Sequence, residues 1–247
     1  MSHYYFRQLS RQEQGVYQKA YEGILGGKDS VRANHVGMER FSQIVECLSY
    51  DHPEFYFVDF QKIEMTHSQK AGTQWKIRYK YPANRIREEV RQMNDKVNRI
   101  IASAGAIAQD TPLIRCRWIH DTLVKNVVYD DQAFAHPDIY PDAYTVRGVF
   151  EKRRAVCQGI ALAVTLLGER LGLELPMVSG MEKNKENGEN AGHAWNLVRI
   201  NGTWAHMDVT WDINQSSLFR TIRYDYFCIS DDACRRDHIF HDLPGCP

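Results

Sequence analysis

The sequence has no long apolar run and no excess of one charge. No stretch approaches the roughly 18 uninterrupted apolar residues of a membrane span, and the beginning, MSHYYFRQLSRQEQ, lacks the apolar segment of a secretory signal. We therefore expect a cytoplasmic protein without a membrane span. The 31 Lys and Arg residues are balanced by 31 Asp and Glu residues. Nucleic-acid binding draws on an excess of cations that displace counterions, so we expect no nucleic-acid partner.

Cysteine is scattered and has no paired spacing. There are six cysteines in 247 residues, and no Cys-x-x-Cys pair occurs. A chain of this length buries a core without disulfides, so we expect reduced thiols, each a small core residue or a reactive group. Possible metal ligands gather near the C-terminal end, at Cys228, Cys234, His238, His241 and Cys246. Their spacing fits no zinc knuckle, so we expect no metal and no cofactor.

The composition that is present is that of a folded protein. Hydrophobic residues make up 43% and charged residues 25% of the chain, which excludes a wholly disordered or collagen-like protein. The length suits one sizeable domain, or a catalytic domain with a smaller companion. No internal repeat or low-complexity segment is present. The pattern along the chain indicates a first unit over 1–83 and a second unit over 84–247.

The first unit is predicted to contain helices and a β-hairpin. Apolar residues at spacings of three and four predict helices over 10–25 and 36–49. The aromatic run FYFVDFQKIEM predicts a strand over 55–65, and alternation predicts its neighbour over 74–81. Gly72 is expected in the turn between these strands.

The second unit is predicted to begin with two helices. The first is a long amphipathic helix over 84–108, and the second spans 112–126, with Thr111 as its cap and Pro112 at its first position. Further on, the polar run from Met181 to Gly192 is typical of a mobile surface loop. Because that loop leads directly to the next histidine, it forms either a rim for a substrate or a simple solvated connection.

Cys157 begins the apolar run CQGIALAVTLLGERLG, which predicts a buried helix ending at Gly172. A thiol in the first turn of a helix lies beside unpaired backbone N–H groups and the positive end of the helix dipole, which favour the thiolate. Three basic residues, KRR, add positive charge shortly before it. Cys157 is therefore either a nucleophile or a small buried residue at a helix start.

The strongest turn signal in the chain is Asn201-Gly202, a pair that suits a two-residue type I′ turn. The flanking segments HAWNLVRI and TWAHMDVTW predict antiparallel strands over 193–200 and 203–211. A two-residue loop would also fix the register of this β-hairpin.

In that register Trp195 faces Asp208, and His193 lies one diagonal away on the same face. The β-carbons of His193 and Asp208 are then roughly 5–8 Å apart, which lets an imidazole meet a carboxylate. Asp212 is the opposite diagonal neighbour of His193, so the register leaves it open as the acid. We prefer Asp208, because it is expected inside the strand and is therefore held more firmly.

These residues satisfy a chemical requirement. A cysteine nucleophile needs an imidazole to accept its proton, and the imidazole needs an acceptor on its other nitrogen that fixes its tautomer and orientation. Cys157, His193 and Asp208 supply all three groups from one helix start and one hairpin. The alternative is structural: a half-buried histidine and an acid that stabilises a turn.

The segments AVCQGIALA, GHAWNLVRINGTW and HMDVTWD resemble the three core motifs of the transglutaminase-like superfamily, relatives of the papain-type cysteine proteases. The resemblance covers roughly Ile114–Asp212, and the segments YTVRGVFEKRRAVCQG and YFCISD, with Gly180, are similar to uncharacterised bacterial members. It implies an α+β fold in which the helix bearing the nucleophile packs on an antiparallel sheet. Residues 84–247 then form a catalytic domain, preceded by a helical and β-hairpin extension.

The resemblance also implies roles. Cys157 is the nucleophile, His193 the general base and then acid, and Asp208 the orienting carboxylate. The implied reaction is acyl transfer on a peptide or carboxamide bond of a peptide or protein, through a thioester. Family members stabilise the oxyanion with an upstream aromatic residue, for which Tyr129 is the first candidate and Trp118 the second, beside the backbone N–H of the nucleophile.

Two tryptophans are expected to frame this site. Trp195 is a candidate substrate-binding residue that also shields the imidazole from water, and Trp211 lies close by. Both have an equally ordinary interpretation as packing residues.

Three functions remain open. A protease or amidase is preferred over a cross-linking transglutaminase, because cross-linking members often depend on calcium and the sequence has no calcium-binding loop of the Asp/Asn-Gly kind. The third function is a catalytically silent module that holds a peptide or partner in the same cleft. A complete set of Cys157, His193 and Asp208 weighs against that module.

Overall fold

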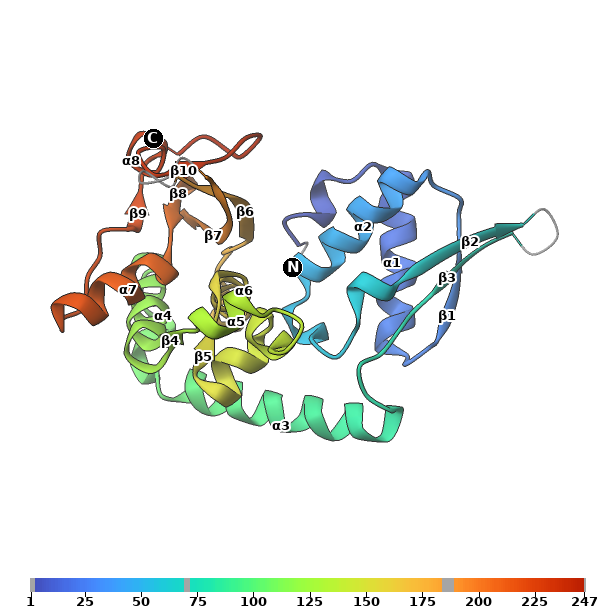
Figure 1. The fold of residues 1–247 in the computed structure, drawn as a ribbon, viewed down its shortest axis with the longest axis horizontal. Coiled ribbons are helices and arrows are strands. Elements are labelled where there is room, and N and C mark those ends of the chain that lie inside the picture. Colours follow the sequence, from blue (N-terminus) through green and yellow to red (C-terminus); the bar gives the residue numbers. More distant parts are fainter. Residues whose placement is uncertain (1–2, 69–71, 184–188, 247) are drawn as a thin grey trace. The chain divides into compact units, whose positions relative to one another are not determined.

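The structure is a computed structural model that describes residues 3–68, 72–183 and 189–246. The chain forms two compact units, Met1–Gln92 and Met93–Pro247 (Figure 1). Their boundary falls within helix α3 (Ala83–Ala102), whereas the sequence pattern places it just before that helix. Residues 184–188 of the polar loop predicted over 181–192 lie outside the described residues, and the two ends of that run belong to β6 and β7.

The first unit pairs two helices with a three-stranded antiparallel sheet. Helix α1 (Arg11–Leu25) and helix α2 (Met38–Asp51) confirm the two predicted helices. A reciprocal capping box between Ser10 and Glu13 begins α1, which satisfies backbone donors that the helix leaves unpaired. The sheet has the order β1-β3-β2, with β1 at Ser30–Ala33, β2 at Glu64–Ser68 and β3 at Gly72–Lys76. A β-hairpin was predicted in this region, but its strands lie at 64–68 and 72–76 and not at 55–65 and 74–81, and β1 was not predicted.

The predicted strand over 55–65 is wrong for most of its length. Residues Pro53–Phe55 and Phe60–Lys62 form short 3-10 helices, and extended structure begins only at Glu64. The aromatic run is apolar because consecutive residues from Phe55 to Val58 are buried, not because they alternate across a sheet. A continuous apolar run has no period, so it cannot distinguish a strand from another buried segment.

The second unit surrounds a central helix, α6 (Cys157–Arg170), with a sheet and further helices. The five-stranded antiparallel sheet has the order β10-β6-β7-β8-β9. Its strands are β6 Met177–Glu182, β7 Ala191–Ile200, β8 Thr203–Met207, β9 Phe227–Ile229 and β10 His238–Ile239. Helix α6 packs against β7, which is the α+β arrangement that the sequence predicted.

The remaining helices support this core. Thr111 accepts a hydrogen bond from the backbone N–H of Ile114 and so caps α4 as predicted. The predicted long helix ends at Ala102, before a 3-10 turn over Gly105–Gln109. The other helices of this unit are α4 Pro112–Asn126, α5 Asp131–Ala135, α7 Val209–Phe219 and α8 Asp231–Cys234, with single turns over Pro141–Tyr144 and Gly148–Lys152.

The β7–β8 hairpin has the predicted turn and register. Asn201 and Gly202 both have positive φ, 52° and 86°, as a type I′ turn requires. The strands pair from Ile200 with Thr203 to Asn196 with Met207. The prediction fails beyond Met207, because the chain turns into α7 and does not continue as a strand to residue 211.

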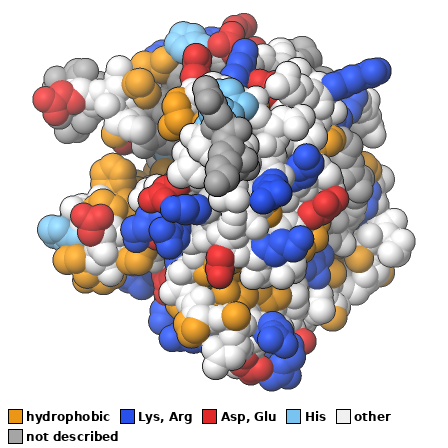
Figure 2. All heavy atoms as spheres, turned by 90° about the vertical axis from the view of Figure 1, so that its right-hand side faces the viewer, with side chains coloured by type: hydrophobic (Ala, Val, Ile, Leu, Met, Phe, Trp, Pro, Cys, Tyr) orange, Lys and Arg blue, Asp and Glu red, His pale blue; other side chains and the backbone are white. Residues whose placement is uncertain are grey.

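Charged side chains of both signs are scattered over the face that Figure 2 shows. All six cysteines are free thiols. Among the described residues, no helix combines the length and the apolar character needed to cross a bilayer.

Gly159, in the first turn of α6, allows a close approach of the chain. A β-carbon there would lie 2.3 Å from the carbonyl oxygen of Ala143 and 3.0 Å from that of Thr145. These are backbone atoms and cannot rotate away. The start of α6 therefore sits directly against the 143–145 segment.

Gly159→Ala should lower the free energy of unfolding of the second unit by about 1–3 kcal/mol, the usual cost of overpacking. Gly192→Ala is the matched control, because a β-carbon at Gly192 meets no atom within 4 Å. Denaturant unfolding of both variants measures the difference, and equal stability losses would contradict this account of Gly159.

Candidate active site

Cys157 is the first residue of α6. The short parallel pair of β4 (Val128–Tyr129) and β5 (Arg154–Ala155) leads the chain to it, and the N–H of Val156 donates to the carbonyl of Ala143 at 3.1 Å. Val156 provides no side-chain cap, so no capping side chain occupies the start of the helix. Cys157 is 8% exposed. Its thiol thus lies at the amino end of a helix that is itself almost wholly buried.

His193 extends from β7 toward this thiol. Its Nε2 lies 2.6 Å from Oδ2 of Asp208, and its ring also shares a hydrogen bond with the thiol of Cys157. Since Nε2 is taken by Asp208, Nδ1 is the nitrogen that faces the sulfur. The structure therefore brings the three predicted residues into one continuous chain of contacts.

Asp208 is held at both oxygens. It is the N-cap of α7, and its Oδ1 accepts a hydrogen bond from the backbone N–H of Trp211 at 3.1 Å. Its Oδ2 contacts Nε2 of His193 and also Nε2 of His238, at 3.0 Å. We expected Asp208 inside a strand, and this was wrong: the aspartate is fixed by capping a helix instead.

Burial and charge act in opposite directions on this pair. Burial alone would lower the pKa of His193, but the negative charge and hydrogen bond of Asp208, with a further hydrogen bond to Cys157, raise it to about 10. Burial alone would raise the pKa of Asp208. The charges and hydrogen bonds of His193 and His238 have the larger effect and hold this pKa well below its usual range. Both shifts favour an imidazolium beside a carboxylate.

Asp212 does not take the place of Asp208. It lies one turn further along α7, and its Oδ2 contacts Nε2 of His120 on α4 at 3.1 Å. The backbone N–H of Tyr226 donates to the same carboxylate. The alternative that the hairpin register left open is thereby resolved, because β8 ends at Met207 and the helical turn points the two acids at different histidines.

Of the aromatic candidates for the oxyanion, Tyr129 lies close enough to Cys157 to respond to its charge. Burial, and next the charge of Cys157, raise the pKa of Tyr129. Tyr144 responds in the same way, but its hydroxyl donates to the carbonyl of Ala133 at 3.3 Å. Trp118 is a half-buried residue of α4.

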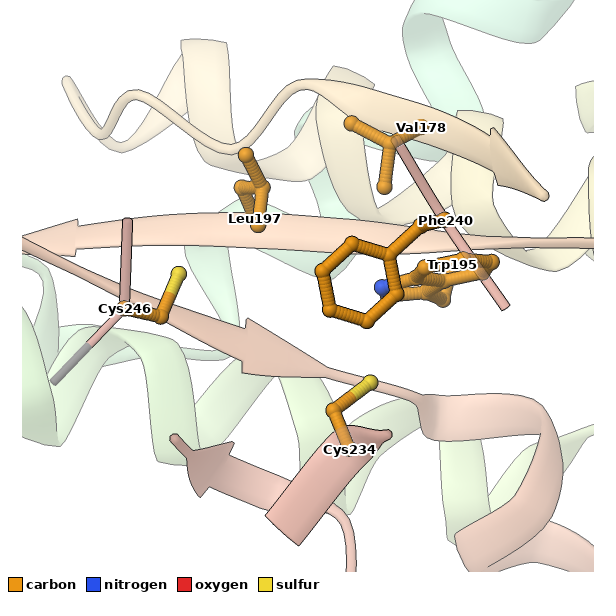
Figure 3. Close-up of a cluster of buried hydrophobic side chains, with 6 residues drawn as sticks. All are labelled: Val178, Trp195, Leu197, Cys234, Phe240 and Cys246. Carbon is orange, nitrogen blue, oxygen red and sulfur yellow. The ribbon is translucent and has the colours of Figure 1, made fainter. Parts of the chain in front are cut away.

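Trp195 is buried against the imidazole ring of His193. It is 1% exposed, and its ring stacks on His193 with centroids 5.8 Å apart. Its indole N–H donates to Nδ1 of His206 at 2.9 Å. Figure 3 shows the indole beside Phe240 within a cluster of buried apolar side chains. The expected direct contact of Trp195 with substrate is therefore corrected to a packing role, because neither its N–H nor its face is accessible.

Asn196 ties the strand that carries the histidine to the helix that carries the thiol. Its amide nitrogen donates to the carbonyls of Ala161 and Leu175 at 3.1 and 3.2 Å, and lies 3.3 Å from Oγ1 of Thr165. All of these groups are buried, so the amide would be costly to leave unpaired. The sequence signal was present, since Asn196 is a polar residue inside an apolar strand, but it did not reveal the partners.

His238 is the residue of the site that the sequence analysis missed. The sequence suggested His238 only as a possible metal ligand. Its contact with Asp208 joins residues that are 30 positions apart in the chain. Two groups of described residues have ligand atoms within 4.8 Å of one another, namely His193, Asp208 and His238, and His206, Asp231 and Cys246. In both groups the histidine nitrogens and the carboxylate oxygens lie at hydrogen-bond distance from each other, so their geometry is that of direct hydrogen bonds.

Burial disfavours the thiolate form of the other five cysteines. Burial raises the pKa of Cys47, Cys116, Cys228 and Cys246 to about 12 in each case, and it also raises the pKa of Cys234. Since the thiolate is the nucleophile, these five cysteines are expected to react slowly.

The contact between His193 and Asp208 predicts a pH dependence. The raised pKa means that this pair adds stability below the ordinary histidine value of 6.5, and that the contribution is lost as pH rises toward 10. Asp208→Asn removes the charge and leaves the burial, so the pKa of His193 should fall to 6.5 or below. Nuclear magnetic resonance titration of the imidazole measures this shift. Asp212→Asn serves as the control and should leave the titration of His193 near its original position.

Comparison with known proteins relates the site to a family. Residues 101–209 match the family described as Transglutaminase-like superfamily, and this segment contains Cys157, His193 and Asp208. A solved structure titled "Crystal structure of a TGase" is 17% identical, with a TM-score of 0.39, over 60% of this chain and 43% of that chain. The present chain thus spans less than half the length of that protein. A search of curated proteins finds no match. Through residues 101–209, the chain is thus similar to the transglutaminase-like superfamily.

Proposed function

We propose that this protein is a cysteine acyl-transfer enzyme that cleaves peptide or carboxamide bonds, as a protease or amidase does. The observation that supports this proposal most directly is the contact chain from the Cys157 thiol through His193 to Asp208. We assign the chemistry to the second unit, whose elements supply all three residues. A peptide or protein is the proposed substrate.

The reaction begins with an ion pair. As an imidazolium, His193 donates one N–H to the sulfur of Cys157 and the other to the carboxylate of Asp208, so the sulfur attacks as a thiolate. A carbon–sulfur bond forms at the substrate carbonyl, whose π electrons move to the oxygen. As the tetrahedral species collapses, the carbon–nitrogen bond breaks and His193 gives its proton to the departing amine or ammonia. The product left on the enzyme is a thioester.

Water completes the cycle. His193, now neutral, accepts a proton from water while the oxygen bonds to the thioester carbon. Collapse breaks the carbon–sulfur bond and releases a carboxylic acid, and the thiolate and imidazolium are restored. If a lysine amine replaces water, the product is a cross-linked amide. The same residues serve both outcomes, so the acceptor is an experimental question.

The oxyanion that forms in each half of the reaction needs hydrogen-bond donors. The backbone N–H of Cys157, the first residue of α6, is the proposed main-chain donor. Tyr129 is the proposed side-chain donor, because the hydroxyl of Tyr144 is engaged with Ala133 and Tyr129 lies near the sulfur.

Iodoacetamide should alkylate Cys157 at neutral pH much faster than the other five cysteines, which burial makes poor nucleophiles. Peptide mapping after a short labelling pulse measures the rate at each site. His193→Ala should slow alkylation of Cys157 and leave the remaining cysteines unchanged. Slow and uniform labelling of all six would favour a binding module without catalytic activity.

The bond that is cleaved can be identified by mass. Peptide pools incubated with the wild-type protein should show new fragments if it is a protease, or a gain of about 1 Da per site if it deamidates carboxamides. Cross-linking joins two masses with loss of ammonia. Cys157→Ala is the control and should abolish every such change. Identical spectra for wild type and Cys157→Ala across diverse pools would argue against enzymatic activity on peptides.

A further inference from the structure

A single carboxylate oxygen in the site serves two imidazoles. Oδ2 of Asp208 contacts Nε2 of His193 at 2.6 Å and Nε2 of His238 at 3.0 Å. His238 lies on β10, is 1% exposed, and its ring centroid lies 5.3 Å from that of His193. The mechanism proposed above uses only one of these two rings, so the second requires its own explanation.

The other nitrogen of His238 also faces an acid. Its Nδ1 lies 2.8 Å from Oδ1 of Asp237, and Oδ2 of Asp237 accepts a hydrogen bond from the hydroxyl of Tyr226 at 2.7 Å. An ionised carboxylate can only accept hydrogen bonds, so a ring between two carboxylates must donate from both nitrogens. With a carboxylate oxygen at each ring nitrogen, this geometry favours the imidazolium form of His238. Burial opposes this state, but the hydrogen bonds that His238 makes to Asp208 and Cys234 raise its pKa to about 10.

We propose that His238 is a positioning residue that keeps its positive charge at neutral pH, holds Oδ2 of Asp208 toward His193, and limits how tightly His193 retains its proton. This inference rests on the proposed function, since it concerns the same acid and base. His238 does not touch the reacting atoms and acts entirely through Asp208.

The limiting effect follows from charge. Asp208 stabilises the proton on His193, whereas a second positive ring on the same oxygen opposes it. The groups that face His238 are Asp208, Asp237, Cys234, Tyr226 and the neighbouring rings of His193 and His206. Those that face His193 are Cys157, Asp208 and His238. A general acid must release its proton in every cycle, and an imidazolium held by an unopposed carboxylate is a weaker acid than one whose carboxylate also serves a second positive ring.

The chain contains a matched cluster that lacks a thiol. His120 contacts Asp212 through Nε2 at 3.1 Å and Asp121 through Nδ1 at 3.0 Å. Asp121 in turn accepts a hydrogen bond from the hydroxyl of Tyr224 at 3.1 Å. The His238 cluster has the same order of residue types, namely Tyr226, Asp237, His238 and Asp208. The last acid of one cluster, Asp208, is the N-cap of α7, and that of the other, Asp212, lies in its first turn. His120 is thus the natural control for a buried histidine between two acids.

The experiment measures the alkylation rate of Cys157 by iodoacetamide as a function of pH. Wild type is compared with His238→Gln, His238→Asn, Tyr226→Phe and the control His120→Gln. The amide nitrogen of glutamine replaces Nε2 and keeps the donor to Asp208 without the charge. Asparagine is too short to reach Asp208. Circular dichroism and thermal unfolding establish that each variant is folded at the temperature of the assay.

In His238→Gln the alkaline inflection, where His193 loses its proton, should move to higher pH, with the rate at neutral pH within about threefold of wild type. His238→Asn should slow alkylation on the order of tenfold, because the second hydrogen bond on Asp208 is lost. Tyr226→Phe should shift the inflection in the same direction as His238→Gln but less. His120→Gln should leave both rate and inflection unchanged, whatever its effect on stability.

The result that overturns the proposal is an unchanged inflection in His238→Gln together with a wild-type rate in His238→Asn. An equal shift in His120→Gln would also overturn it, since the effect would then be one of general stability. If variants at His238 do not fold, selective nitrogen labelling of histidine in wild type replaces them, and a neutral His238 ring at pH 7 refutes the proposal. Slow alkylation of Cys157 in wild type would instead refute the proposed function.

Discussion

The carboxylate of Asp208 is the element on which the site depends. One oxygen caps α7, and the other accepts hydrogen bonds from His193 and His238. A side chain that is bonded at both oxygens has little rotational freedom, so the imidazole it holds has a defined orientation. Since β8 passes directly into α7 at this residue, the sheet and the helix both position the acid. The same residue therefore joins the sheet to α7 and organises the proposed site.

The distance between thiol and imidazole is set by the packing of α6 against β7. Asn196 bonds across this junction to the backbone of the helix and of the segment that follows it. Gly159 allows the 143–145 segment to lie against the first turn of α6. Reactive groups that must meet within a hydrogen-bond distance gain most from rigid supports, because small displacements are costly in rate. The buried core of this unit supplies that rigidity.

Helix α7 carries two aspartates one turn apart, and each meets a histidine that also contacts a neighbouring acid. Both clusters contain a tyrosine, two acids and a buried histidine, yet only the one at Asp208 reaches Cys157. Location relative to the start of α6 therefore separates a proposed catalytic group from a structural one. Neither residue type nor burial distinguishes His120 from His238, since both are fully or almost fully buried.

The sequence alone determined those features that depend on local rules. Helix starts at Ser10 and Thr111, the Asn201-Gly202 turn with its register, and the thiol at the start of α6 all follow from contacts between residues close in the chain. What tertiary structure decided was the choice of partners. Contacts between distant segments decide that Asp208, and not Asp212, meets His193. They also decide that His238 shares Oδ2 of Asp208 and that Trp195 is buried against the His193 ring. Periodicity describes which face of an element is buried, and it contains no information on which distant side chain lies opposite.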